Sequence, residues 1–232
     1  MTLDRVIIAL DFSSKKEALK IVDELDELIS FYKVGLELFL NEGAEILKTL
    51  KKREKKIFLD LKFHDIPNTV QRAVKTSLNY GVDMLTLHTT GGFEMMKRAR
   101  ETVEEARVRE NVSLKLLGVT VLTSLDSKSL EEIYGLTFDI PSLVKKLAML
   151  AKKTGVDGVV ASAHEISAIK ERCGRDFTVV TPGIRLEKQS HDDQKRTVTP
   201  QEAFLRGADY IVIGRAVISS QNPREVLLNL FR

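Results

Sequence analysis

Charged residues recur near the ends of the first three apolar, strand-like runs of the sequence. Asp11 follows the first run, Lys33 lies in the second, and Asp60 and Lys62 lie in the third, with Asp65 shortly after it. Carboxylates and ammonium groups can transfer protons and stabilise charge that develops during a reaction. These residues are therefore the first candidates for chemistry.

The alternation of side chains along a strand groups these charges further. Asp60 and Lys62 should share one face of their strand, while Leu59 and Leu61 should face outer helices. A lone charge buried at such a place is costly, so the charges are expected to pair. One pair alone is typical of a structural ion pair, but opposite charges on three successive strands favour a functional cluster.

Two motifs near the end of the sequence favour a phosphate site. They are Thr181-Pro182-Gly183-Ile184-Arg185 and Gly214-Arg215. Glycines let backbone amides approach an anion, and a guanidinium binds phosphate through two hydrogen bonds. The polar segment 185–199 is expected to be a mobile loop whose Gln194 closes over the phosphate. Ordinary glycine turns, surface arginines and a solvated insertion are the alternative.

Strand-like runs alternate with amphipathic stretches along the whole chain. The expected strands are 6–10, 31–36, 57–62, 84–88, 114–122, 158–162, 178–182 and 210–214. The expected helices are 14–28, 41–52, 67–80, 92–108, 142–154, 164–173, 200–206 and a last one after Pro223. Capping signals support two helix starts, at Ser14 with Glu17 and at Thr199 before Pro200.

Eight strand–helix units in 232 residues predict a single-domain (β/α)8 TIM barrel over residues 1–232. An open doubly wound sheet is the other arrangement compatible with the alternation. No G-x-G-x-x-G motif follows the first strand, which disfavours that sheet. In a barrel, the ends of the strands meet at one rim, where active sites form.

The composition narrows the class of protein. A net charge of +3, 43% hydrophobic residues and one cysteine describe an ordinary globular chain rather than a nucleic-acid binder. The apolar runs have the length of strands, so we expect no membrane span, no secretory signal and a cytoplasmic location. His64, His88 and Cys173 show no metal-binding spacing, so no metal is expected.

The third run resembles the D-x-K-x-x-D-I-x-x-T signature of the orotidine 5′-phosphate decarboxylase family. The residues that match are Asp60, Lys62, Asp65, Ile66 and Thr69, and the likeness continues through the other strand ends. The shorter core D-x-K-x-x-D also occurs in related sugar-phosphate decarboxylases and hexulose-phosphate synthases. In the gulonate-phosphate branch an acidic residue at the second strand helps to hold Mg²⁺. Lys33 stands there in this sequence, so the resemblance favours the branch without metal or cofactor.

The resemblance implies decarboxylation of orotidine 5′-monophosphate to UMP and CO2, a step of de novo pyrimidine biosynthesis. By the same resemblance, Lys62 is the proton donor, Asp60 lies beside the scissile carboxylate, and Lys33 and Asp65 complete the charged network. The implied substrate-binding residues are Asp11, Lys33, Ile66, Thr69, Thr123, Ser124, Pro182, Arg185, Gln194, Gly214 and Arg215.

The family also implies a homodimer in which Asp65, Ile66 and Thr69 reach the neighbouring subunit's site. Two alternatives to this function stay open from the sequence. One is a Mg²⁺-dependent sugar-phosphate decarboxylase or aldolase, and the other is a non-catalytic barrel that binds a phosphate ligand.

Overall fold

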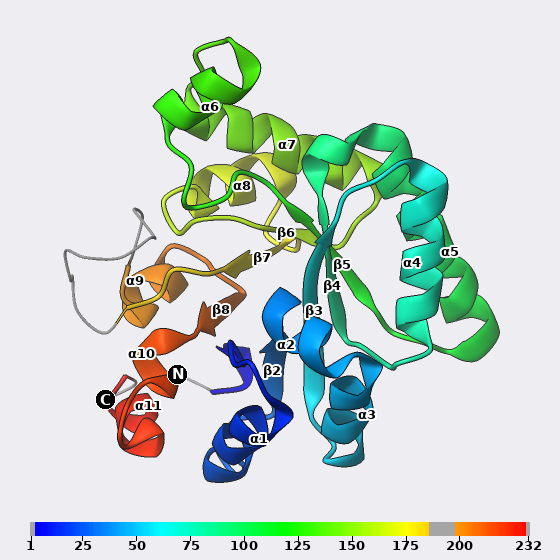
Figure 1. Ribbon diagram of the computed structural model, residues 1–232. Coiled ribbons are helices and arrows are strands. Elements are labelled where there is room, and N and C mark those ends of the chain that lie inside the picture. Colours follow the sequence, from blue (N-terminus) through cyan, green and yellow to red (C-terminus); the bar gives the residue numbers. More distant parts are fainter. Residues whose placement is uncertain (1–2, 186–197, 231–232) are drawn as a thin grey trace.

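The chain forms a closed barrel of eight parallel strands in sequence order, surrounded by helices (Figure 1). A computed structural model describes residues 3–185 and 198–230. The strands are β1 Val6–Ala9, β2 Phe31–Val34, β3 Lys56–Phe63, β4 Met84–His88, β5 Lys115–Val119, β6 Gly158–Val160, β7 Thr178–Thr181 and β8 Tyr210–Ile213. The pairing of β1 with β8 closes the barrel and excludes the open sheet.

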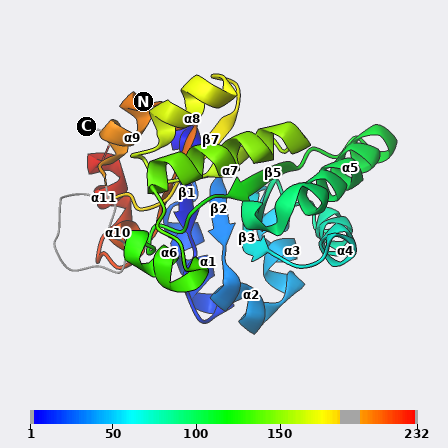
Figure 2. The ribbon, with the colours of Figure 1, turned by 90° about the horizontal axis from the view of Figure 1, so that it is seen from above.

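The helices lie outside the ring of strands, as the view from above shows (Figure 2). They are α1 Lys15–Glu24, α2 Leu36–Glu42, α3 Ala44–Lys52, α4 Pro67–Leu78, α5 Gly92–Glu110, α6 Ser127–Tyr134, α7 Ile140–Thr154, α8 Ile166–Cys173, α9 Pro200–Leu205, α10 Arg215–Ile218 and α11 Pro223–Asn229. Two 3-10 turns, Leu3–Arg5 and Thr89–Gly91, complete the described elements. Within the described parts of the chain, no helix combines the length and apolarity that crossing a bilayer requires.

Three of the described helices were not predicted, and several predicted boundaries were wrong. The first helix ends at Glu24 and not at residue 28, and β5 ends at Val119 and not at residue 122. The additional helices are α2, α6 and α10. The helix expected over 41–52 begins only at Ala44, because Gly43 separates it from α2 with a φ of 59° and a ψ of −151°. A backbone conformation of this kind is open mainly to glycine, so it interrupts the helical pattern at Gly43.

The strands separate two apolar layers. The interior of the barrel holds the smaller cluster, made of Ile7, Ala9, Phe31, Phe58, Met84, Leu117, Val180 and Val212. The larger cluster packs the opposite faces of the strands against the helices, and it includes Leu59 with Leu61 at its edge. Because side chains alternate along a strand, any residue two positions beyond an interior residue also faces the barrel axis.

A helix cap forms at both predicted positions, but of the two only α9 has the complete, reciprocal capping box that was expected at Ser14 and Glu17. Thr199 makes a complete capping box with Glu202, and Pro200 opens α9. At α1, Ser14 Oγ accepts a hydrogen bond from the Glu17 backbone N–H and donates one to the Glu17 carboxylate. Each cap satisfies a backbone donor that the first turn of a helix leaves free.

A repeated aspartate closes the N-terminal end of the barrel. The three residues, Asp83, Asp157 and Asp209, directly precede β4, β6 and β8. Each carboxylate accepts a hydrogen bond from a backbone N–H in the strand that comes before it in the sequence, which is β3, β5 or β7. Each also pairs with a basic side chain from a helix. The bases are Lys51, Arg100 and Lys170, in that order. These bonds tie strands and helices together at the end of the barrel opposite the cavity described next.

Candidate active site

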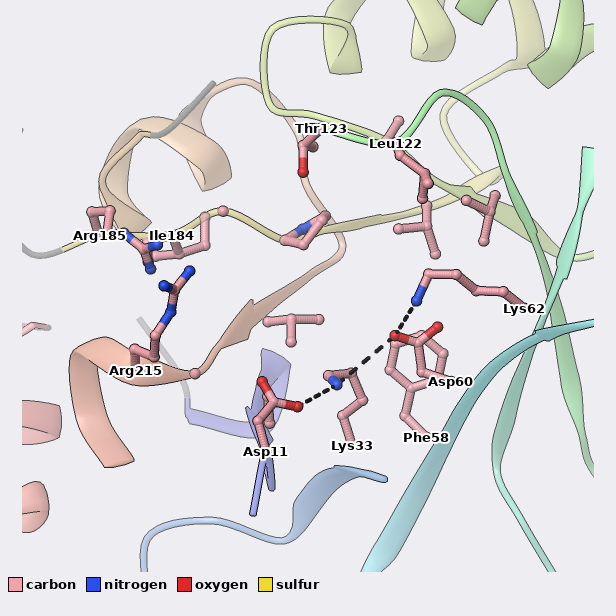
Figure 3. A pocket seen from close by; sticks show the side chains of 18 of the residues that line it. Asp11, Lys33, Phe58, Asp60, Lys62, Leu122, Thr123, Ile184, Arg185 and Arg215 are labelled. Carbon is pink, nitrogen blue, oxygen red and sulfur yellow. Dashed lines mark hydrogen bonds and ion pairs between the residues drawn. The ribbon is translucent and has the colours of Figure 1, made fainter. Parts of the chain in front are cut away.

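Four charged side chains form a row at the C-terminal rim of the barrel (Figure 3). Lys33 Nζ lies 2.9 Å from Asp11 Oδ1 and 3.9 Å from Asp60 Oδ2. Lys62 Nζ lies 2.9 Å from the same Asp60 oxygen. The signs alternate along the row, so each ammonium neutralises a neighbouring carboxylate. The cluster expected from the sequence is therefore present in the structure.

The strand alternation explains how three of these charges meet. Asp11, Lys33 and Asp60 each stand two positions beyond a residue of the interior cluster. Those interior residues are Ala9, Phe31 and Phe58. Each charge therefore faces the barrel axis one layer above the apolar interior.

Lys62 reaches the row by a different route. Strand β3 bulges against β4, because Leu59 pairs with Leu85 while Phe63 pairs with Leu87. Within that bulge Lys62 adopts a φ of 51°, a left-handed conformation that is uncommon for a residue with a side chain. Regular alternation is therefore the wrong explanation for its place beside Asp60, although both side chains line the cavity as expected. Unusual backbone conformations of this kind cluster at functional sites.

Burial increases toward the middle of the row. The side chains of Lys33 and Asp60 are 12% and 13% exposed, whereas Lys62 is 30% and Asp11 is 49% exposed. Partly buried charges attract each other more strongly than charges in water. A Cβ atom at Gly35 would lie only 3.0 Å from Lys33 Nζ, so the glycine leaves room for the ammonium group.

Thr86 is a member of this network that the sequence analysis missed. Its hydroxyl accepts a 2.9 Å hydrogen bond from the Lys62 backbone N–H and donates a 2.9 Å bond to Asp60 Oδ1. Thr86 is fully buried in β4, between Leu85 and Leu87. Two signals were present in the sequence. One is a hydroxyl side chain between two leucines, and the other is the position of Thr86 two residues beyond Met84 of the interior cluster, which turns it toward the barrel axis.

The row borders a cavity of about 250 Å³ whose other side carries the glycine–arginine motifs. Pro182, Gly183, Arg185, Gly214 and Arg215 all line it, as predicted from the ends of β7 and β8. Arg185 and Arg215 lie on one side of the cavity, and Lys62 lies on the other (Figure 3). The cavity thus offers positive charge at one end and alternating charges at the other, an arrangement that suits an extended anionic ligand.

The structure separates the remaining predicted residues. Thr123 lines the cavity, whereas Ser124 is exposed and is not among the described residues around it. Gln194 and most of segment 185–199 lie outside the described residues.

Asp65, Ile66 and Thr69 are exposed and are not brought to the cavity that Lys62 lines. Asp65 Oδ1 accepts a 2.6 Å hydrogen bond from the Ile66 backbone N–H. Asp65 and Ile66 border a separate surface hollow with His64 and Gly91. Within one subunit, the expected charged network thus contains Lys33 but not Asp65.

Two histidines lie beside the charged row. The rings of His64 and His88 are 5.3 Å apart. Burial lowers the pKa of His88, the nearby His64 and Lys62 lower it further, and Asp60 acts in the opposite direction. His88 is therefore held in its neutral form near pH 7.

No metal centre emerges from the described residues. In residues 3–185 and 198–230, no group of three or more histidine, cysteine or acidic side chains is arranged to hold an ion. Cys173 is a buried free thiol, and burial raises its pKa. A raised pKa keeps the thiol protonated and poorly reactive.

Fold and site together define a (β/α)8 protein with an anion-binding end and a row of alternating charges beside one cavity. The family described as orotidine 5′-phosphate decarboxylase / HUMPS matches residues 4–230. The chain belongs to this family.

Individual relatives agree with that assignment. The chain is 48% identical to the orotidine 5′-phosphate decarboxylase of Carboxydothermus hydrogenoformans over 221 residues, which cover 95% of this chain and 92% of the relative. It is 45% identical to that of Legionella pneumophila strain Paris over 228 residues, covering 98% of both proteins. The crystal structure of the enzyme from Lactobacillus acidophilus matches with a TM-score of 0.85 at 34% identity, covering 98% of this chain and 97% of that one.

Proposed function

We propose that this protein is a lyase that decarboxylates orotidine 5′-monophosphate to UMP and CO2 in pyrimidine biosynthesis. The supporting observation is the 2.9 Å contact between Lys62 Nζ and Asp60 Oδ2 at the wall of a cavity that also carries Arg185 and Arg215. Family membership and the names of the relatives point to the same reaction.

Lys62 is the proposed proton donor. When the bond between C6 and the carboxylate carbon breaks, CO2 leaves and the electron pair stays on C6 of the pyrimidine. The fixed ammonium stabilises this developing negative charge and then transfers a proton to C6. Lys62 is 30% exposed, so its amine can take up a new proton from solvent after product release.

Asp60 is proposed to lie beside the substrate carboxylate. Two like charges about 4 Å apart cost roughly 4 kcal/mol at an effective dielectric near 20. Full relief of that repulsion would accelerate the reaction by roughly 10³, whereas enzymes typically supply about 8–23 kcal/mol. Repulsion alone is therefore too small, and we assign the larger share to stabilisation by Lys62 and to binding of distant substrate groups.

The phosphate is the distant group with most binding energy to offer. Arg185, Arg215, Gly214 and Pro182 are the proposed contacts, and Gln194 is the proposed contact from the segment that closes over the phosphate. The guanidinium groups lie across the cavity from Lys62, so phosphate binding would orient the base toward the ammonium (Figure 3).

The middle of the substrate is assigned to the remaining residues. Asp11 and Lys33 are proposed to contact the ribose hydroxyls, since they stand between the arginines and Lys62 in the cavity wall (Figure 3). Thr123 and Ser124 are proposed to lie near the base. Ser124 is exposed, so this assignment requires the segment after β5 to approach the bound substrate.

The proposed active form is a homodimer in which Asp65, Ile66 and Thr69 complete the partner's site. The position of Asp65 outside the cavity that Lys62 lines within one subunit supports this, as does the 66% exposure of the residue Ile66. Mixing inactive Lys62→Ala with inactive Asp65→Ala subunits tests it. Random exchange would leave about a quarter of the sites without either change, so activity should reappear. No recovery, or a monomer in sedimentation velocity, would contradict the dimer.

The reaction is proposed to need neither metal nor cofactor. Lys33 lies between Asp11 and Asp60. Its ammonium repels a divalent cation, and it also neutralises the two carboxylates that would otherwise bind such a cation. EDTA should leave activity unchanged, whereas inactivation reversed by Mg²⁺ would favour the sugar-phosphate branch of the family. We place the protein in the cytoplasm, where its free Cys173 thiol would stay reduced.

The direct test follows the ultraviolet absorbance of orotidine 5′-monophosphate incubated with the purified protein. A fall in absorbance with formation of UMP is the expected result. Tight binding without turnover would instead indicate a barrel that only binds phosphate ligands.

A further inference from the structure

Thr86 occupies a special place between the third and fourth strands. The pairs Leu59 with Leu85 and Phe63 with Leu87 leave Thr86 alone opposite the bulged residues 60–62. The bulge interrupts the ladder of backbone hydrogen bonds there, so its backbone groups need other partners. The side chain of Thr86 supplies one, because its Oγ1 accepts the Lys62 backbone N–H.

The direction of both hydrogen bonds of Thr86 is determined. An amide N–H can only donate, so the hydroxyl accepts from Lys62, and a carboxylate can only accept, so the hydroxyl donates to Asp60 Oδ1. The other Asp60 oxygen, Oδ2, receives Lys62 Nζ at 2.9 Å. The contacts therefore form a closed ring from the Lys62 backbone through Thr86 and Asp60 to the Lys62 ammonium.

This ring restrains the reacting groups. It holds Lys62 in its left-handed conformation with a φ of 51°, and it fixes the rotation of the Asp60 carboxylate through both oxygens. Thr86 itself is fully buried and is not one of the described residues that line the cavity. It can influence the reaction only through Asp60 and Lys62.

We propose that Thr86 is a positioning residue for the decarboxylation. Its hydroxyl holds the Asp60 carboxylate beside the substrate carboxylate and the Lys62 ammonium beside C6. This inference rests on the proposed function. A group displaced by about 1 Å can cost roughly 100-fold in rate, which gives the hydroxyl a measurable role.

Thr86→Val tests the inference, since valine keeps the shape of threonine and removes the hydroxyl. We expect kcat to fall about 10- to 100-fold, with KM for orotidine 5′-monophosphate and the Kd for UMP changed less than about threefold. Thr86→Ser restores the hydroxyl and should recover kcat to within about threefold of the parent. Thr86→Ala lacks the hydroxyl without adding bulk and should behave like the valine variant.

Thr102→Val is the matched control. Thr102 is also buried, and its hydroxyl donates a 2.9 Å bond to the Arg98 carbonyl within α5, away from the cavity. Its kcat should equal that of the parent. This control separates the loss of one buried hydroxyl in general from the loss of the hydroxyl beside Asp60.

Three results would overturn the positioning role. The first is a kcat for Thr86→Val and Thr86→Ala within about threefold of the parent, and the second is a serine variant as slow as the valine variant. The third is a folded serine variant beside valine and alanine variants that do not fold, which would assign the hydroxyl to stability alone. An inactive parent would instead contradict the proposed function itself, so the two failures are distinguishable.

Discussion

Lys62 Nζ lies 2.9 Å from Asp60 Oδ2, although the two residues are only two positions apart on β3. In a regular strand, side chains at that spacing project in parallel from points roughly 6.6 Å apart. The bulge and the left-handed backbone of Lys62 turn its side chain back toward Asp60. The two residues of the signature are thus neighbours because the strand is irregular between them.

Replacing Lys62 by alanine should nearly abolish turnover of orotidine 5′-monophosphate. The variant lacks both the ammonium that stabilises the carbanion and the proton that C6 receives, so we expect kcat to fall by at least about 10³-fold. The absorbance assay measures this loss, and circular dichroism should show a folded protein. Retention of near-normal activity would remove Lys62 from the role of proton donor.

Lys56→Ala provides the control on the same strand. Lys56 is exposed at the first position of β3, at the opposite end of the barrel from the cavity. Its removal changes the net charge by the same amount as Lys62→Ala but should leave kcat and KM unchanged.

Arg215→Ala should weaken binding of the phosphate-bearing substrate far more than binding of the bare nucleoside. A hydrogen bond to a charged group is worth about 1.5–3 kcal/mol, so kcat/KM for the nucleotide should fall roughly 10- to 100-fold. Arg224, on the exposed side of α11, offers the control Arg224→Ala with unchanged kinetics. Equal losses for nucleotide and nucleoside in Arg215→Ala would exclude the phosphate role.

Much of this site follows from regular features of the sequence. Alternation along strands predicts that Asp11, Lys33 and Asp60 face one cavity, because each of their strands is regular up to that residue. The order of the strands around a barrel likewise predicts that Arg185 and Arg215 lie on neighbouring strand ends. Both features depend only on periodicity and on the closure of the sheet.

The remainder depends on local irregularities that carry no periodic signal. The bulge before Phe63 and the hydrogen bonds of Thr86 arise from the fit between β3 and β4, which the sequence of neither strand reveals. The short helix α6 did have a detectable start, because Asp126 caps it by accepting from the Ser129 N–H three positions later. Asp65 shows a further limit of prediction from the sequence. It stands three positions after Lys62 in the signature, yet it does not line the cavity that Lys62 lines.

The stability of the protein should depend on pH through His88. Its pKa is lowered below the ordinary value of 6.5, first by burial and then by His64 and Lys62. The unfolded chain therefore binds a proton near pH 6.5 that the native protein does not yet bind. Stability is greatest above that pH and falls as the pH drops toward the native pKa, below which the penalty stays constant.

His88→Gln should remove this part of the pH dependence. We expect Tm to fall less between about pH 7.5 and about pH 5.5 in the variant than in the parent. Thermal unfolding at several pH values measures both slopes. Equal slopes would show that His88 does not couple protonation to folding.

Asp157 should matter for stability and not for catalysis. Its carboxylate accepts a 2.8 Å hydrogen bond from the Leu116 backbone N–H and lies 3.1 Å from the Arg100 guanidinium, at the N-terminal end of the barrel. Asp157→Ala would leave both donors without this partner, so we expect the free energy of unfolding to fall by about 2 kcal/mol. Urea unfolding should show a lower midpoint at an unchanged m-value, while kcat per folded molecule stays the same.

Asp176→Ala removes an exposed carboxylate just before β7 and should leave the midpoint unchanged. A parent-like midpoint in Asp157→Ala, or a loss of kcat in its folded form, would contradict the separation of a stabilising end from a catalytic end of this barrel.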